Sequence, residues 1–167
     1  GNLDLPQSNT AISTTEFKNG NSSTHTGTDQ TYIYQVPQNS TFLYVMLVGG
    51  GGGGGRPFAA AATAGAGGGG SGSVTKGILL TALLPKTLLV QVGRGGPGAT
   101  ANSSPGLTGG STGIFGYALP TGAVAVGNVI LTALGGGAGA AATTGGTAGA
   151  AFTTASGRWA GALANWT

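Results

Sequence analysis

Seven consecutive glycines, Gly49 to Gly55, follow directly after an apolar run, and this junction limits what the chain can fold into. The run, 41–48 (TFLYVMLV), is β-branched and aromatic, which predicts a strand buried on both faces. The glycine tract cannot continue as a helix, because interior glycine costs about 1 kcal/mol relative to alanine. The chain therefore passes from an apolar strand into a glycine segment that is not helical.

Glycine-rich tracts recur along the chain, at 65–72, 93–98 and 135–149. Strand-forming residues lie between them and predict further strands, at 31–36, 73–80, 87–92, 112–117 and 123–134. Short strands with Gly and Pro punctuation favour an all-β fold with a sandwich or jelly-roll-like body. Phe115 and Tyr117 follow the strand pattern and are expected in its core.

The glycine tracts admit several interpretations. Gly93 to Gly98 fits the G-x-G-x-x-G nucleotide loop, but no helical pattern and no acid follow it, so this motif is rejected. A collagen pattern needs glycine at every third position, and Arg56 and Pro57 break that register. A flexible linker would not recur with similar flanks. Two possibilities stay open: ordered but irregular loops, or extended three-residue helices of polyglycine II type packed in hydrogen-bonded layers.

The distribution of charge argues against catalysis. All three acids (Asp4, Glu16, Asp29) and the single His25 lie in the first 29 residues, and there is no cysteine. The bases beyond Asp29 are Arg56, Lys76, Lys86, Arg94 and Arg158. General acid–base chemistry, metal cages and Cys–His or Ser–His–Asp sites all lack their side chains there, so we expect no enzyme, no metal and no cofactor. Five scattered bases also form no nucleic-acid patch.

The chain divides into three parts by composition. Residues 1–30 are expected to form a polar N-terminal arm or linker, 31–149 a glycine-rich β domain, and 150–167 a C-terminal tail that contacts a neighbour. Residues 1–30 have no apolar core of the signal-peptide kind. No run of about 20 apolar residues occurs, so no membrane span is expected.

Large side chains beside the glycine tracts are the candidate contacts with a neighbouring subunit or a receptor, because aromatic residues and arginine are favoured interface anchors. They are Arg56, Phe58, Arg94, Phe152, Arg158, Trp159 and Trp166. For the two tryptophans, packing or subunit contact is favoured over ligand binding.

The order of the motifs resembles a known family. An aromatic strand ends in Val36-Pro37, and the series VGGGG (48–52), VGRGG (92–96) and STGIFG (111–116) follows. Over roughly residues 30–140 this resembles the glycine-rich domain of bacteriophage tail fibres and related virion proteins. Two departures are Lys86, where the family has glycine after its Leu-x-Pro turn, and the alanine-rich region after Gly135.

The resemblance implies a virion structural protein, a tail fibre or capsid decoration component. Its expected partners are copies of itself, as a trimer, other virion proteins, and a host surface glycan or protein met by exposed loops. The alternative is a bacterial cell-surface or extracellular glycine-rich protein with a structural or adhesive role, which would place it outside the cell rather than in a virion.

Overall fold

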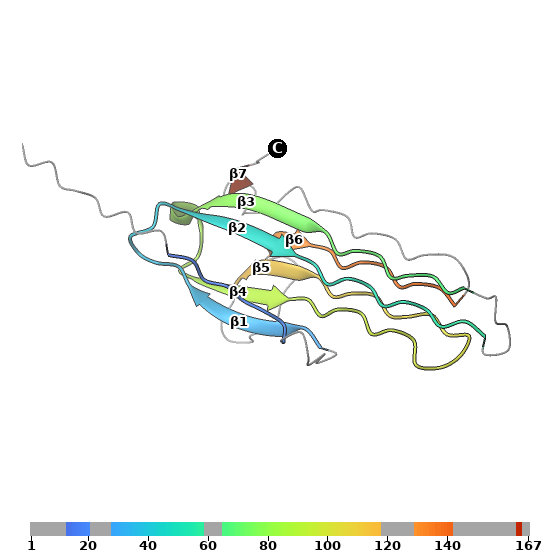
Figure 1. The fold of residues 1–167 in the computed structure, drawn as a ribbon. Coiled ribbons are helices and arrows are strands. Elements are labelled where there is room, and N and C mark those ends of the chain that lie inside the picture. The colour runs from blue at the N-terminus through green and yellow to red at the C-terminus, as the bar shows by residue number, and fades with distance from the viewer. Residues whose placement is uncertain (1–12, 21–27, 59–64, 118–128, 142–162, 165–167) are drawn as a thin grey trace, which may run out of the picture.

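The computed structural model describes residues 13–20, 28–58, 65–117, 129–141 and 163–164. Within these ranges the ordered structure is almost entirely strands and extended segments, with one 3₁₀ turn, η1 (Thr81–Leu83). The strands lie at one end, and the glycine-rich segments run out of them side by side (Figure 1). The all-β prediction is confirmed.

The strands form two antiparallel sheets. One sheet has the order β1-β4-β5-β6, with β1 Gln30–Gln35, β4 Thr87–Val92, β5 Thr112–Gly116 and β6 Val129–Ala133. The other has the order β2-β3-β7, with β2 Phe42–Val48, β3 Val74–Leu80 and β7 Leu163–Ala164. In the second sheet Phe42 lies opposite Leu80 and Val48 opposite Val74, so β2 and β3 are paired along their whole length.

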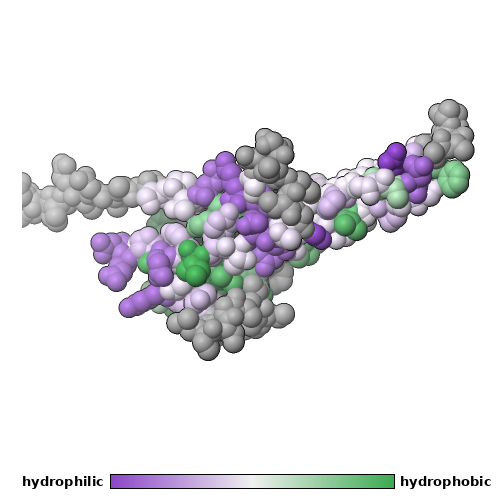
Figure 2. Space-filling view, turned by 90° about the horizontal axis from the view of Figure 1, so that it is seen from below, coloured by the Kyte–Doolittle hydropathy of each residue, from purple (hydrophilic) through white to green (hydrophobic). Residues whose placement is uncertain are grey.

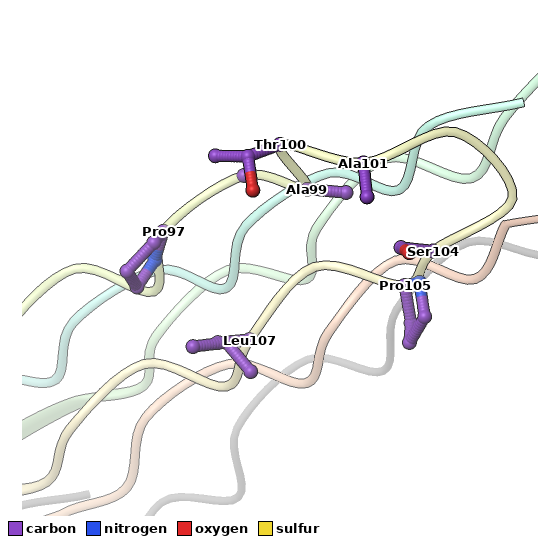
Figure 3. A pocket seen from close by; sticks show the side chains of 8 residues that line it. Pro97, Ala99, Thr100, Ala101, Ser104, Pro105 and Leu107 are labelled. Atoms are coloured by element: carbon purple, nitrogen blue, oxygen red, sulfur yellow. The ribbon is translucent and has the colours of Figure 1, made fainter.

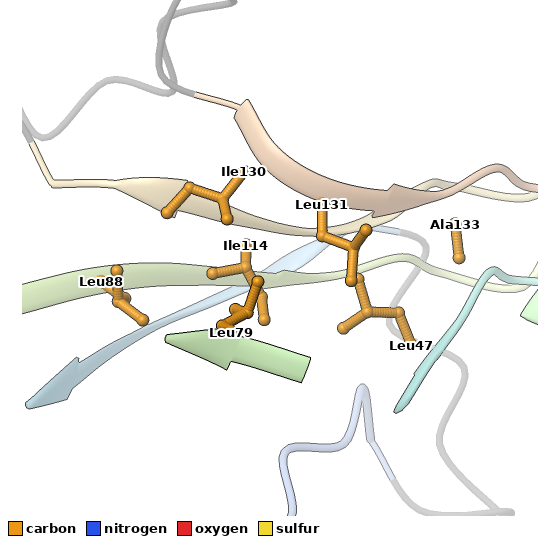
Figure 4. Close-up of a cluster of buried hydrophobic side chains, with 7 residues drawn as sticks. All are labelled: Leu47, Leu79, Leu88, Ile114, Ile130, Leu131 and Ala133. Carbon is orange, nitrogen blue, oxygen red and sulfur yellow. The ribbon is translucent and has the colours of Figure 1, made fainter. Parts of the chain in front are cut away.

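The apolar core lies between the two sheets. Leu79 of β3, Leu88 of β4 and Ile130 of β6 are almost completely buried. The whole cluster, drawn in Figure 4, is Leu47, Leu79, Leu88, Ile114, Ile130, Leu131 and Ala133. Both sheets supply it, as expected for a sandwich in which inward side chains of the two sheets interdigitate. The core is small, and it anchors the glycine segments at one end.

The prediction that the strand at 41–48 is buried on both faces is wrong. Leu47 is buried, but Phe42, Tyr44 and Met46 alternate with the inward residues and are 56–58% exposed. The β2–β3 sheet is an outer layer, and its outward side chains remain exposed. An apolar run has no period-two polarity when both its inward and its outward residues are apolar, so sequence alone could not separate the faces.

The other strand predictions agree with the structure. Phe115 is buried as expected, and Tyr117 is half-buried. The strand expected at 123–134 is present as β6, and residues 118–128 lie outside the described ranges. Part of the predicted N-terminal arm packs on the body: the ring centroid of Phe17 lies 5.2 Å from that of Tyr32 and 5.9 Å from that of Tyr34.

Candidate functional site

Five extended segments leave the strands in one direction and form what we call the glycine bundle (Figure 1). We number them in chain order: segment I (49–57), segment II (65–73), segment III (93–99), segment IV (104–111) and segment V (134–141). Segments I, III and V follow the ends of β2, β4 and β6, while segments II and IV lead into β3 and β5. Each strand thus sets where its segment starts.

Segment I lies at the centre of the bundle, and its backbone bonds to all four other segments. Every third N–H donates to segment II: Gly49 to Ser73, Gly52 to Gly70 and Gly55 to Gly67, at 2.8–2.9 Å. The next row of N–H groups donates to segment IV: Gly50 to Gly110, Gly53 to Leu107 and Arg56 to Ser104, at 2.8–2.9 Å. Both partners run antiparallel to segment I, and the spacing of three residues is that of a polyproline II or polyglycine II helix.

The carbonyls of segment I accept bonds from the two segments that run parallel to it. Segment III donates from Gly96 to Gly51 and from Ala99 to Gly54, at 2.7 and 2.9 Å. Segment V donates from Gly136 to Gly50 and from Gly139 to Gly53, at 2.8 and 2.9 Å. An extended three-residue helix has no internal hydrogen bonds, so these lateral bonds satisfy its peptide groups.

The outer segments also bond to one another. Segment II donates to segment V, and segment IV donates to both segment III and segment V. Around segment I the neighbours therefore follow in the order III, IV, V and II. For the described parts of the tracts the two alternatives left open by the sequence are resolved: these parts form ordered polyglycine-II-like layers.

Close approach, not backbone conformation, requires glycine in segment I. Among the described bundle glycines none has a φ in the left-handed region. A Cβ on Gly49, Gly52 or Gly55 would instead overlap a backbone carbonyl of segment V, and one on Gly50 or Gly53 would overlap a carbonyl of segment III. Any side chain at these positions would push two backbones apart.

The base of the bundle is held by two polar side chains. The Asp29 carboxylate accepts the backbone N–H of Arg94 at 2.9 Å and the amide of Gln91 at 3.1 Å, at the start of segment III. The buried Thr112 hydroxyl donates to the carbonyl of Val48 at 2.6 Å and accepts the N–H of Gly93 at 2.9 Å. Thr112 thereby joins the points where segments I and III leave their strands.

The far end of the bundle is closed by the turn 100–104 between segments III and IV. Arg56 ties segment I to this turn: its guanidinium Nη1 donates to the carbonyl of Thr100 at 2.8 Å. Ser103, in the turn, has φ 56° and donates its N–H to Pro57 at 3.3 Å. Non-glycine residues with positive φ are uncommon, and strained backbone often lies at binding sites.

A hollow of about 270 Å³ lies against this turn (Figure 3). Segments III and IV form its two sides, and the lining side chains carry no charge. Among them are Pro97, Ala99, Thr100, Ser104, Pro105 and Leu107. Figure 2 shows the bundle as largely pale, with hydrophilic and hydrophobic residues gathered at its far end. The bundle thus presents mixed side chains at its tip and few along its length.

The predicted contact residues separate into three groups. Arg56 and the 66% exposed Phe58 lie together at the far end. Arg94 lies at the opposite end, beside Asp29. The remaining four candidates fall outside the described residues: Phe152, Arg158, Trp159 and Trp166.

Sequence reasoning missed the turn 100–104 and the structural use of Asp29. Asn102-Ser103-Ser104-Pro105 is a turn signal that could have located the tip. No comparable signal marks Asp29, because its partners lie 62 and 65 residues away in sequence.

Within the described ranges no group of His, Cys, Asp or Glu could hold a metal ion. No helix in these ranges is long and apolar enough to cross a bilayer. The family model described as a glycine-rich domain matches residues 24–166. No curated protein and no solved structure matches the chain.

Proposed function

Because the chain belongs to the glycine-rich domain family, we propose that it is a structural display protein of a virion, a tail fibre or capsid decoration component. The strand body and the sides of the glycine bundle are the parts that assemble with copies of the chain and with other virion proteins. The glycine bundle holds the turn 100–104 away from that body, where a host surface glycan or protein can reach it. The observation that carries the proposal is the bundle: five backbone-bonded segments that end at a common tip.

The physical character of the bundle supports this role. Its segments are joined by backbone hydrogen bonds in both chain directions, so it can be long and narrow without an apolar core. The tip carries the types of side chain that anchor contacts, with Arg56 and Phe58 beside the uncharged hollow. Binding residues often sit on loops that a rigid scaffold positions.

A bacterial cell-surface or extracellular adhesion protein is the second candidate. The same tip and bundle would serve there, since display of a loop on a rigid support does not depend on what the body is attached to. The absence of acids after Asp29 supports both candidates against an enzyme, and the expectation of no catalytic activity stays a prediction.

Immunogold electron microscopy distinguishes the two locations. Antibodies raised against the purified protein should label virus particles that encode this chain and leave the envelope of uninfected cells unlabelled. Label on the envelope of uninfected cells, with none on particles, would contradict a virion role and support the alternative.

Surface binding by the tip is tested with the purified protein on glycan arrays and host cells. Arg56→Ala together with Phe58→Ala should lower binding at least tenfold. Lys86→Ala is the matched control, because Lys86 is an exposed base in the strand body beside β4. Equal binding by both variants would show that the contact lies elsewhere.

A further inference from the structure

One row of N–H groups on segment I has no partner within the described chain. With three residues per turn, the N–H groups point in three directions. Two directions are taken by segments II and IV, and the third row consists of Gly51 and Gly54. Their carbonyls accept bonds from segment III, but their N–H groups donate to no described residue, and Gly51 is exposed.

No described residue lies close enough to this row to exclude a side chain. A Cβ added to Gly51 would lie 3.7 Å from the carbonyl oxygen of Gly70, and one added to Gly54 would lie 3.6 Å from that of Gly67. These are ordinary van der Waals distances, in contrast to the overlaps at Gly52 and Gly53. The bundle therefore has a side on which segment I is not covered by another described segment.

The same side continues as an apolar surface on β2. Phe42, Tyr44, Met46 and Val48 point outward and are 50–58% exposed. Their cross-strand partners on β3 include one charged residue, Lys76, opposite Met46. An exposed apolar row of this length on a strand at the end of its sheet is typical of a protein contact.

The four segments that already contact segment I indicate what kind of partner fits its remaining side. Each is filled by an extended glycine-rich segment, two of them parallel and two antiparallel. In each of these pairs the hydrogen bonds run from one segment to the other and never back: segment I donates to II and IV, and accepts from III and V. The row of Gly51 and Gly54 therefore matches a row of carbonyls on another extended glycine strand, and it cannot bond to an identical row.

We propose that this side, formed by Phe42, Tyr44, Met46 and Val48 with Gly51 and Gly54, is the contact with a second copy of this chain. The proposal rests on the proposed function, in which the protein assembles with itself, and it adds where the copies meet. A partner must place an extended glycine strand with free carbonyls against segment I, next to the apolar row of β2. This chain has such a glycine strand on its own exterior.

Segment II of the second copy supplies the matching strand. Gly68 is exposed, a Cβ there would meet nothing within 4 Å, and its carbonyl accepts no N–H among the described residues. The contact then joins two different surfaces, segment I of one copy and segment II of the next. Contacts of this head-to-tail kind generate closed rings when the rotation closes, which agrees with the expected trimer.

Light scattering after size-exclusion chromatography tests the contact over a range of concentrations. The native protein should elute as an oligomer. The double variant Gly51→Val, Gly54→Val places side chains in the open row and should raise the dissociation concentration at least tenfold, with unchanged circular dichroism. Thr108→Val is the control, because it puts the same side chain on an exposed position of segment IV, on the opposite side, and should leave the mass unchanged.

Met46→Glu tests the apolar half of the contact without relying on the bundle. The new carboxylate lies opposite Lys76, so the fold tolerates it, and assembly should weaken as in the double variant. An oligomeric native protein whose folded variants all keep its mass would overturn this contact while leaving self-assembly intact. A native protein that stays monomeric at all concentrations would overturn both, and immunogold labelling would still test the virion role separately.

Discussion

At the scale of single residues, two buried threonines play opposite parts. Thr112 is 5% exposed, and its hydroxyl donates to Val48 of the other sheet and accepts from Gly93. Thr75 on β3 is 6% exposed, and its hydroxyl has no hydrogen-bond partner among the described residues. A buried hydroxyl stabilises only when it is bonded, because it has given up its bonds to water. Equal burial thus has different consequences at these two positions.

We predict that valine, which keeps the shape of threonine, separates these two effects. Thr112→Val leaves the N–H of Gly93 and the carbonyl of Val48 without their partner and should lower the free energy of unfolding by about 1–3 kcal/mol. Thr75→Val removes an unbonded buried hydroxyl and should leave the free energy of unfolding unchanged or raise it. Urea unfolding measures both, and a similar loss in the two variants would contradict this assignment of roles.

At the scale of elements, the residues of a glycine segment face three directions in turn, so every third residue shares the same neighbour. This position, and not composition, determines what each glycine contacts. Gly52 faces segment V so closely that no Cβ fits, whereas a Cβ on Gly51, the preceding residue, would make an ordinary van der Waals contact with the carbonyl oxygen of Gly70, at 3.7 Å. Both have backbone conformations that alanine can adopt. The tolerance of a substitution should therefore change from one residue to the next with a period of three.

Gly52→Ala and Gly51→Ala form the matched pair that tests this period. A Cβ at Gly52 overlaps the carbonyl of Gly137, and we expect a loss of about 2 kcal/mol or more in the free energy of unfolding. In the monomer, Gly51→Ala should stabilise by about 0.4–1 kcal/mol, because alanine restricts the unfolded chain at a position it fits. Chemical denaturation of both variants gives the two values. Destabilisation of similar size at both positions would refute the three-row arrangement.

The strands were predictable from the sequence, and the packing of the glycine segments was not. Runs such as 87–92 carry β-branched and apolar side chains, and the structure places β4 there. A tract such as Gly49 to Gly55 has no side chains to show a period, so the sequence left layers and irregular loops equally open. One signal was available: residues other than glycine within the segments include Ser71, Leu107 and Thr108, and all three are exposed.

The candidate site was predictable only in part for a similar reason. Arg56 and Phe58 stood out because they are large residues beside a glycine tract, and the structure places them at the tip. Arg94 also lies beside a glycine tract, but it is the second residue after β4, whereas Arg56 is the eighth residue after β2. Arg94 therefore lies at the base of the bundle, beside Asp29.

At the scale of the whole molecule, two different kinds of interaction stabilise the two parts of the described chain. The body is stabilised by a small apolar core between sheets, while the bundle is held by peptide groups bonded across segments. Burying apolar area gives unfolding a large positive heat-capacity change, and burying peptide groups lowers it. A larger share of bundle relative to body should therefore lower the heat-capacity change of unfolding.

We expect a heat-capacity change of unfolding below that of ordinary globular proteins. Those show about 12–15 cal/mol/K per residue, and a chain whose bundle buries mainly polar backbone should give less than about 9 cal/mol/K per ordered residue. Differential scanning calorimetry gives the total, and hydrogen exchange counts the ordered residues by their protected amides, so that unprotected chain does not lower the average. A value in the ordinary range would mean that the bundle buries apolar surface, and backbone bonds alone would no longer account for its order.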